Sequence, residues 1–561
     1  MKKRIPFSTI YAIIACSFCV VSLPSCKNNK SIPHSKDGKA LINIGTYNGG
    51  VGSEWINNIC AELKEQFADY VDPELEAAGL KGVDFRVDVN ESHYGENLES
   101  GLPLDIYFTE MVDYAYYAKK GLFMDVTDVV TSSLSEFGDT GTIEDKLDAN
   151  FKSFLKCIDN KYYGLPFYEG FYNLMYDVDL FDKEFLFFNE DGDIGETSSS
   201  TNLSKGPDNV AGTWDDGLPS TYEQFDVLMD NLSGSYTPIV LTGGTTNYVN
   251  RYIQNHFVNY EGKEQSLLNY TFNGTATHLG TVEQSGSSLT INQDATPTTI
   301  TQFSEGAVLQ KQLGKYYALD FLKNHMMNGS LKTASSHLQA QKDFISTKYG
   351  NNQKEYAYGL LVEGSWWENE AGDYLKADES KGGGKLNRRF GILPVPKVSE
   401  EQLGEKQTVI SLNSSFCFVS KDACYPELTK QIFKFFHTNK SLSSFTTTTS
   451  TTRAFSYTIE DSDAPNCSYY AKQLLAMKKT CDIVYPYSSD SHVLDKKTNF
   501  SMDKYPWSIG VTTSNVFDQF NNNLETPVSY FRKMYTYATQ WWNKKIDLWR
   551  RHCLVVTKKG K

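Results

Sequence analysis

The N-terminal part of the chain alternates short apolar strands with helices, and this rhythm constrains the fold more than any other sequence feature. An apolar strand over 40–47 breaks into the glycine-rich turn 48–53, and a helix with an apolar residue at every fourth position follows from Glu54. Apolar stretches at 83–89 and 104–108 predict the next strands. Strands that alternate with helices favour a mainly parallel sheet. The sequence therefore predicts an α/β fold.

The glycine-rich turn 48–53 does not match a nucleotide-binding loop. It lacks the GK[ST] ending that reaches phosphates and magnesium, and its glycines do not fit GxGxxG. We therefore predict a tight turn in which Ser53 caps the following helix. The unbonded N–H groups at the start of that helix are expected to face a cleft.

The length of the chain predicts more than one folding unit. A single hydrophobic core seldom organises as many as 561 residues, so two lobes are expected. The tract 187–216 is rich in Gly, Ser and Asp and predicts an irregular insertion, while Thr-rich alternation over 259–301 predicts a hairpin excursion. The threonine run 446–452 predicts an exposed loop.

The N-terminus has the layout of a secretory signal, with basic residues followed by an apolar stretch that is too short to cross a membrane. Residues 23–26, Leu-Pro-Ser-Cys, then resemble a bacterial lipobox. These features predict a signal peptide over 1–25, lipidation at Cys26 and a polar tether over 26–39. Because Pro24 is unusual in a lipobox, an ordinary signal peptide stays the alternative.

Charge and composition exclude several classes of function. The net charge is −14, and no Lys/Arg cluster with interleaved aromatic residues is present outside the extreme ends of the chain, so no nucleic-acid partner is expected. The 10 cysteines include no CxxC pair, and His residues are scattered singly, so we expect neither a metal site nor a cofactor. Most cysteines are expected to be buried small hydrophobes, although an oxidised Cys467–Cys481 pair stays open.

Three separated stretches resemble the family 1 extracellular solute-binding proteins of ABC importers, the large group that includes the maltose-binding protein. Residues 163–166 and 174–181 are similar to the family's Y-G-L-P … Y-N-K-D-L-F crossing segment, with Asp and Val in place of the usual Asn and Lys. Residues 358–367 resemble its apolar strand that ends in Gly-x-Trp, and 390–396 resemble its F-G-x-x-P-x-P element. The stretch 187–300 departs from the family in length and texture.

The resemblance implies a periplasmic-binding-protein-like α/β fold with two discontinuous lobes joined by two or three hinge crossing strands. It also implies that the lobes close on a ligand by hinge motion. The expected division is 40–165 plus 392–452 for the first lobe and 166–391 plus 453–550 for the second.

Candidate ligand-binding residues follow from strand ends and from the resemblance. Tyr47 and Asn48 end the first strand and Glu110 follows the third, where ligands gather in open α/β sheets. A sugar site also needs rings to stack on and charged or amide groups that form strong hydrogen bonds. The remaining candidates come from the motif positions and from the end of the threonine run: Glu169, Tyr172, Glu363, Trp366, Trp367 and Arg453.

Simpler interpretations of these candidates stay open. Tyr47 and Asn48 could be plain turn residues, Glu169 could be a solvated acid, and Arg453 could pair with a surface acid. At least one of the adjacent tryptophans after the strand is expected to belong to the core, and the first of them is the stronger candidate for the cleft.

The resemblance and the aromatic content of 14% favour a carbohydrate ligand, with an oligosaccharide favoured over a monosaccharide. The predicted function is that of a monomeric lipoprotein, anchored to the outer face of a bacterial membrane, that delivers the sugar to ABC importer permease subunits without being an enzyme. One alternative is an exported glycoside hydrolase, which needs two carboxyl groups about 5 to 9.5 Å apart. The other is a surface adhesin or a sensor binding protein.

Overall fold

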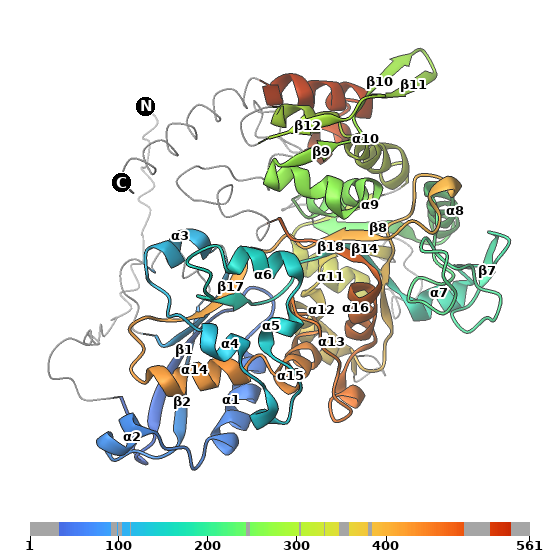
Figure 1. The fold of residues 1–561 in the computed structure, drawn as a ribbon. Helices are drawn as coiled ribbons and strands as arrows, with labels where there is room; N and C mark the ends of the chain where they lie inside the picture. The colour runs from blue at the N-terminus through green and yellow to red at the C-terminus, as the bar shows by residue number, and fades with distance from the viewer. Residues whose placement is uncertain are drawn as a thin grey trace, which may run out of the picture.

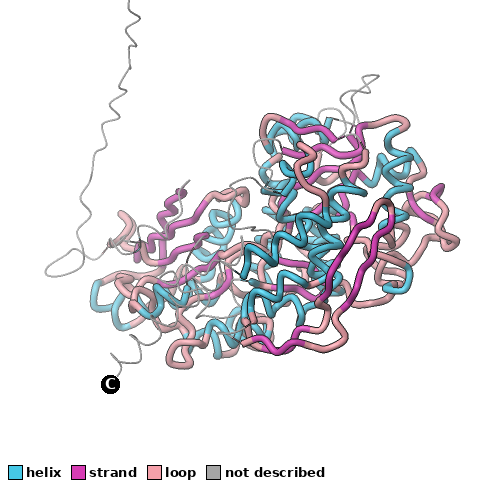
Figure 2. The backbone as a smooth tube through the Cα atoms, turned by 90° about the horizontal axis from the view of Figure 1, so that it is seen from above, coloured by secondary structure: helices cyan, strands magenta, loops and turns pink. Residues whose placement is uncertain are grey.

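The computed structural model describes residues 33–90, 98, 104–110, 112, 114–242, 247–301, 305–329, 331–346, 358–379, 384–486 and 516–539. The predicted signal peptide 1–25, the lipidation of Cys26, the start of the tether and residues 540–550 lie outside these ranges. Two five-stranded sheets organise the described residues into two lobes (Figure 1). Seen from above, the lobes lie side by side in an elongated molecule (Figure 2).

The first lobe contains the sheet β2-β1-β3-β17-β4. Its strands are β1 (Ala40–Tyr47), β2 (Val83–Asn90), β3 (Ile106–Glu110), β17 (Ser415–Val419) and β4 (Leu165–Pro166). β1 pairs in parallel with β2 and β3, while β17 runs antiparallel to β3 and β4. The predicted strands and their parallel arrangement are therefore confirmed in this lobe.

Helices from both ends of the chain cover this sheet. They are α1 (Glu54–Gln66), α2 (Pro73–Ala78), α3 (Tyr114–Lys119), α4 (Thr127–Thr131), α5 (Ile143–Lys146), α6 (Ala149–Leu155), α14 (Pro426–Phe435) and α15 (Asn439–Thr449). α1 buries its apolar stripe, including Trp55, Ile59 and Leu63. Ser53 stands at the N-cap position of α1 as predicted, but its side chain makes no capping hydrogen bond. α1 also packs against α15, so segments that are far apart in the sequence share one core (Figure 1).

The prediction of an exposed loop over 446–452 is wrong. α15 runs to Thr449, and Thr446, Thr449, Thr451 and Thr452 are fully buried. A buried threonine needs a partner for its hydroxyl, and the hydroxyl of Thr449 donates to the Phe445 carbonyl at 2.8 Å. Thr451 and Thr452 instead bond to Ser365 and Glu169, which are far along the chain, so the burial of this polar run does not show in the sequence.

The second lobe contains the sheet β13-β8-β14-β5-β15. Its strands are β13 (Leu331–Ala334), β8 (Thr237–Thr242), β14 (Tyr358–Gly364), β5 (Tyr172–Asp177) and β15 (Phe390–Leu393). β13, β8 and β14 are parallel, and β5 runs antiparallel to β14 and β15. β5, β14 and β15 are buried along their whole length, as expected for strands that are covered on both faces.

The helices of the second lobe are α7 (Val178–Glu184), α8 (Tyr222–Ser233), α9 (Asn247–Thr271), α10 (Leu313–Asp320), α11 (His337–Ser346), α12 (Trp367–Glu370), α13 (Gly372–Glu379), α16 (Tyr469–Thr480) and α17 (Val516–Asn521). α9 is kinked at Gly262, whose φ of 75° only glycine adopts readily. Residues 527–539 are also helical. Two parallel strands, β16 (Thr408–Ile410) and β18 (Asp482–Val484), pack beside α9.

The two predicted insertions differ in structure. The tract 187–216 holds a short antiparallel pair, β6 (Phe187–Phe188) and β7 (Ile194–Glu196), and is otherwise made of turns. In the tract 259–301, α9 continues to residue 271 before the hairpins begin. The strands after it are β9 (Gly274–Ala276), β10 (Gly280–Ser285), β11 (Ser288–Gln293) and β12 (Thr298–Ile300), and β10 and β11 form a hairpin.

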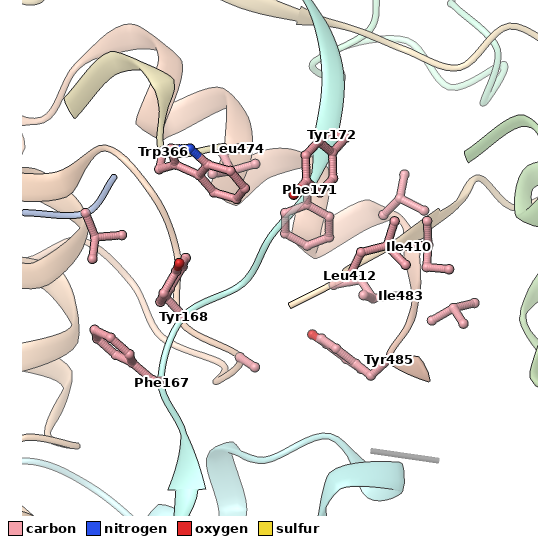
Figure 3. Packing of buried hydrophobic residues seen from close by; sticks show 14 of the residues in the cluster. Phe167, Tyr168, Phe171, Tyr172, Trp366, Ile410, Leu412, Leu474, Ile483 and Tyr485 are labelled. Carbon is pink, nitrogen blue, oxygen red and sulfur yellow. The ribbon is translucent and has the colours of Figure 1, made fainter. Parts of the chain in front are cut away.

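Within the described residues, three segments pass between the lobes and bond to one another. The first follows β4 at 167–171, the second is 411–414, and the third leaves α15 at 450. The Glu169 N–H donates to the Thr452 carbonyl at 2.9 Å, and the Leu412 N–H donates to the Gly170 carbonyl at 2.8 Å. Figure 3 shows Phe167 to Tyr172 along the first segment, with Leu412 close to Phe171. These bonds join the crossing segments into one hinge region.

β15 contains residue 392, where the chain was predicted to return from the second lobe to the first. β15 pairs with β5, and beyond it the Lys397 N–H donates to the Ser220 carbonyl of the second lobe at 2.8 Å. β16, at 408–410, packs on α9. We therefore propose that the chain returns to the first lobe near 411.

Candidate functional site

A cavity of about 700 Å³ lies between the two lobes. The first lobe lines it with Tyr47, Asn48, Gly49, Gly50, Gly52 and Glu110, and the crossing segments add Tyr168 and Asn413. The second lobe lines it with Tyr172, Tyr248, Arg251, His337, Leu338, Trp366, Asn369 and Glu370. A cavity of this size, bordered by both lobes, is a candidate small-molecule site.

The lining residues sit where the topology of the sheets places them. In the first lobe they follow the carboxyl ends of β1 and β3. In the second lobe most of them follow β8, β13 and β14, whose parallel strands end at the same edge of that sheet, and Tyr172 begins the antiparallel β5 at this edge. Ligands bind outside the carboxyl ends of strands in open α/β sheets. The two edges therefore face one cavity from opposite sides.

Aromatic rings form one wall of this cavity. The ring of Tyr172 meets those of Trp366 and Tyr248 edge to face, at centroid distances of 5.4 and 5.3 Å. Tyr168 approaches Trp366 from the first crossing segment at 6.3 Å, also edge to face. Such pairs hold rings in fixed orientations. The wall is therefore rigid and amphipathic, because each tyrosine also brings a hydroxyl.

Polar groups from both lobes complete the cavity. Burial raises the pKa of the Glu110 carboxyl to about 8, while Arg251 acts to lower it. Asn413 donates to the Glu110 carboxylate at 3.4 Å, and the Arg251 guanidinium donates to the Tyr172 hydroxyl. A carboxyl group that holds its proton at neutral pH can both donate and accept a hydrogen bond. This set suits a ligand with many hydroxyl groups.

A second polar pair lies on the rim that the second lobe contributes. His337 is the first residue of α11, and its Nε2 lies 3.4 Å from the Glu370 carboxylate. The other Glu370 oxygen accepts from the Gln341 side-chain amide at 2.7 Å. Glu370 is thus held by neighbours on its own lobe.

The structure brings five of the nine predicted site residues together around the cavity: Tyr47, Asn48, Glu110, Tyr172 and Trp366. They come from β1, β3, β5 and the end of β14, which span most of the chain. That these side chains contact a ligand stays a prediction. The other four predicted residues do not line this cavity.

Glu169 is buried in the hinge instead of lining the cavity. One carboxylate oxygen lies 2.6 Å from the Lys478 ammonium and accepts from the Thr452 hydroxyl at 2.6 Å, and the other accepts from the Tyr485 hydroxyl at 2.6 Å. Only 1% of Glu169 is exposed. The prediction of a cleft-floor acid is corrected to an ion pair that ties crossing segments together.

Trp367 and Glu363 lie in the core of the second lobe. Trp367 packs edge to face on Phe390 at 5.0 Å and is fully buried. Glu363 is fully buried within β14, and burial raises its pKa well above the ordinary value of 4.5. Alternate residues of a strand point to opposite faces, so a motif that ends a strand supplies both core and cleft residues.

Arg453 is buried, contacts backbone carbonyls and does not line the cavity. Its guanidinium donates to the carbonyls of Phe167 and Phe436 at 2.8 Å each and to that of Pro166 at 3.1 Å. Burial lowers its pKa from the ordinary value of 12.5. Arg453 thus fixes the start of the first crossing segment.

Sequence reasoning missed several lining residues, among them Tyr168, Tyr248, Arg251, Asn413 and Asn369. Tyr248 and Arg251 lie at the start of α9, just beyond the carboxyl end of β8. The strand-end rule applied to the first lobe would have found them, had β8 been identified. Asn413 carries no such signal, because its position depends on how the crossing segments meet.

A second cavity of about 600 Å³ is lined by residues 145–148 of the first lobe, by residues 454–459 that follow the third crossing segment, and by Lys263 and residues between 475 and 485 of the second lobe. Lys478 and Tyr485, the partners of Glu169, lie on its wall. The Tyr168 side chain therefore lines the first cavity, whereas the side chains that bind the neighbouring Glu169 line the second cavity.

Searches for other kinds of site gave no candidate in the part of the chain that the structure describes. No helix there has the length and apolar character needed to cross a bilayer. No three His, Cys, Asp or Glu side chains there gather in a way that could hold a metal ion. Cys467 and Cys481, whose oxidised pairing was left open, are free thiols in the structure. Cys157 is exposed, unlike the buried cysteines that were expected.

Comparison with solved structures identifies the class of fold. The bacterial solute receptor AcbH, described as having an exclusive preference for β-D-galactopyranose, is 12% identical to this chain with a TM-score of 0.50, and the match covers 90% of this chain and 99% of AcbH. The ligand-free form of RafE from Streptococcus pneumoniae is 12% identical with a TM-score of 0.51, over 91% of this chain and 100% of RafE. The chain therefore has the two-lobe solute-binding fold that its sequence predicted. No protein-family model and no curated protein sequence matches it.

Proposed function

We propose that the chain is the carbohydrate-binding component of an ABC importer, which takes up a saccharide between its lobes and delivers it to the permease without altering it. The observation that carries this proposal is the interlobe cavity, where rings and hydrogen-bonding groups face one space from both lobes. Sugars present apolar CH faces and hydroxyl edges, so they need both kinds of group. The shared fold with the solute receptors AcbH and RafE supports it.

The partners and location belong to the same proposal. The permease subunits would recognise the closed form, and the protein would act as a monomer held at the outer face of the membrane by lipid on Cys26. Cys26 lies at the end of the lipobox-like residues 23–26. Labelling cells with a radioactive fatty acid tests the anchor: wild type should carry label, and Cys26→Ser should carry none. Label retained in the variant would refute lipidation at this residue.

The binding step is tested by a thermal-shift screen of the chain from Lys27 onward against oligosaccharides, monosaccharides, amino acids, peptides and polyamines. A ligand at 100 times its dissociation constant stabilises the folded state by about 2.7 kcal/mol. We expect a saccharide to raise the melting temperature and to be recovered intact. Arg251→Met should abolish this rise because it removes a cavity hydrogen-bond donor, whereas Arg532→Met alters an exposed arginine and should preserve it.

The other outcomes of the screen separate the alternatives. A saccharide recovered cleaved would replace the proposal with a glycoside hydrolase, whose acid would need a raised pKa such as that of Glu110. Failure of every saccharide, with the chain folded, would contradict carbohydrate binding and favour an adhesin or a sensor. A shift by a peptide or polyamine alone would keep a solute-binding function but change the ligand class.

A further inference from the structure

The glycine-rich turn of the first lobe lies directly on the second lobe at one side of the cavity. The Asn369 side-chain amide donates to the Gly50 carbonyl at 2.7 Å. Gly50 has a φ of +80°, and a Cβ at this position would lie 2.7 Å from Cγ of Trp366 and nearer still to Cδ1. Real Cβ atoms do not approach other atoms that closely. The backbone of this turn can therefore rest on the indole only because residue 50 has no side chain.

The indole of Trp366 is enclosed by protein on several sides. A Cβ at Gly364 would lie 2.7 Å from Cε2, so a second glycine makes room for the benzene ring of the indole. Tyr168, Tyr172 and Tyr248 surround it edge to face, at centroid distances of 6.3, 5.4 and 6.4 Å. Only 7% of Trp366 is exposed. The indole is thus packed between rings of its own lobe, the crossing segment and the glycine-rich turn of the first lobe.

We propose that the turn 49–52 and the segment 366–369 form a latch, that is, an interlobe contact that holds the two lobes closed. In this latch the turn packs on the Trp366 indole, and the Asn369 amide donates a hydrogen bond to the Gly50 carbonyl. The latch concerns the regulation of the proposed saccharide site, and in that respect it rests on the proposed function.

Two physical terms act in the latch. Contact between the turn and the indole removes apolar surface from water, and the amide–carbonyl bond adds a directional term. Both exist only while the lobes touch, so both favour the closed state over the open one. A methyl group at residue 50 would force the turn off the indole and remove both at once. The glycines of this turn, which match no phosphate-binding motif, are then explained by the close approach of two lobes.

The test measures the distance between the lobes without any ligand. Spin labels at Glu76→Cys on α2 and Val227→Cys on α8, both exposed, report the separation by double electron–electron resonance in the folded chain. Exposed Cys157, half-buried Cys424 and the C-terminal Cys553 are replaced by serine in a chain that starts at Lys27, to limit labelling to the two introduced thiols. We expect the wild type to give a distance distribution dominated by the closed state. Gly50→Ala should move most of it to longer distances, and Asn369→Ala should move part of it.

A matched control isolates the clash from the cost of backbone strain. Gly212 has a φ of +82°, and a Cβ there would meet nothing within 4 Å. Gly212→Ala therefore carries the same left-handed penalty without touching the other lobe, and its distribution should equal that of the wild type. Circular dichroism confirms that each variant is folded, and Asn369→Ala keeps the test decisive if Gly50→Ala does not fold.

The result that would overturn the latch is a distance distribution unchanged in both folded latch variants. If a saccharide ligand is found, Gly50→Ala should also weaken its affinity about tenfold, because only the closed fraction binds tightly. The two proposals fail separately. A chain that binds no saccharide but opens in Gly50→Ala keeps the latch and loses the proposed function, and the reverse pattern keeps the function and loses the latch.

Discussion

The interlobe cavity and the hinge region behind it are built from neighbouring residues that have opposite environments. Tyr168 lines the cavity, whereas Glu169 is sealed in an ion pair with Lys478. Trp366 borders the cavity, whereas Trp367 packs in the core on Phe390. Adjacent side chains of the extended crossing segment point to opposite sides, and those at the start of α12 point in different directions around the helix, so one short motif builds both regions. Motif position therefore finds the neighbourhood of a site without telling which side chain faces the ligand.

The largest effect that separates the two regions is expected at Glu169. Glu169→Ala leaves the Lys478 ammonium buried without its carboxylate, so the free energy of unfolding should fall by about 3–5 kcal/mol. Chemical denaturation measures this loss. Glu76→Ala, which alters an exposed acid on α2, is the control and should change stability little. A loss below about 1 kcal/mol would show that the ion pair does not organise the hinge.

The acid in the cavity should make the stability of the fold depend on pH. The folded pKa of Glu110, about 8, lies above its ordinary value of 4.5, so the folded chain holds this proton more tightly than the unfolded chain does. Its contribution to stability is therefore full below pH 4.5 and is lost as the pH rises through 8.

Glu110→Gln cannot titrate at this position, so the variant should gain about 4 kcal/mol relative to wild type between pH 5 and 9. Denaturation curves across this range measure the difference, with Glu76→Gln as the exposed control. If the difference in stability between Glu110→Gln and wild type did not vary with pH, Glu110 would be ionised throughout the range. Its folded pKa would then lie well below 8.

The ring wall of the cavity should affect binding more than folding. Tyr248→Ala removes a half-buried ring that borders the cavity, so affinity for a saccharide should fall about tenfold while the fold persists. Calorimetric titration measures the affinity. Tyr535→Ala, at an exposed position on the helical stretch 527–539, is the control and should bind like the wild type. Unchanged affinity in Tyr248→Ala would exclude this wall from the site.

The smallest expected effect concerns the hydrogen bond that joins the threonine run to the hinge. Thr452→Val keeps the shape of the side chain but removes the donor to the Glu169 carboxylate. The free energy of unfolding should fall by about 1 kcal/mol. Affinity should be unaffected, because Thr452 does not line the cavity. If the variant lost affinity without losing stability, the hinge region would contribute directly to ligand binding, and the hinge and the cavity would not be separate regions.

The first lobe was predictable from the sequence to a greater extent than the site. β1, β2 and α1 each carry their own periodicity, and the strand-end rule placed Tyr47, Asn48 and Glu110 at the cavity. Arg453 was misplaced because its partners are backbone carbonyls that only the folded chain brings together.

The second lobe shows the same limit of prediction from sequence patterns. Arg251 was missed because α9 carries no motif and its strand, β8, was not identified. The burial of Thr446, Thr449, Thr451 and Thr452 could not be predicted, because the sequence does not reveal hydroxyl partners such as the Glu169 carboxylate that accepts from Thr452. Local pattern thus predicted elements, while tertiary contacts decided which face of each element became the site.

The most direct measurement is a crystal structure of the chain with a saccharide taken from the screen. The account predicts one saccharide in the cavity between the lobes, in contact with Glu110 and Arg251 and bordered by Tyr172 and Tyr248, with Glu169 still paired to Lys478. A saccharide bound instead in the second cavity, beside Lys478 and Tyr485, would contradict the division of the molecule into a binding cleft and a hinge.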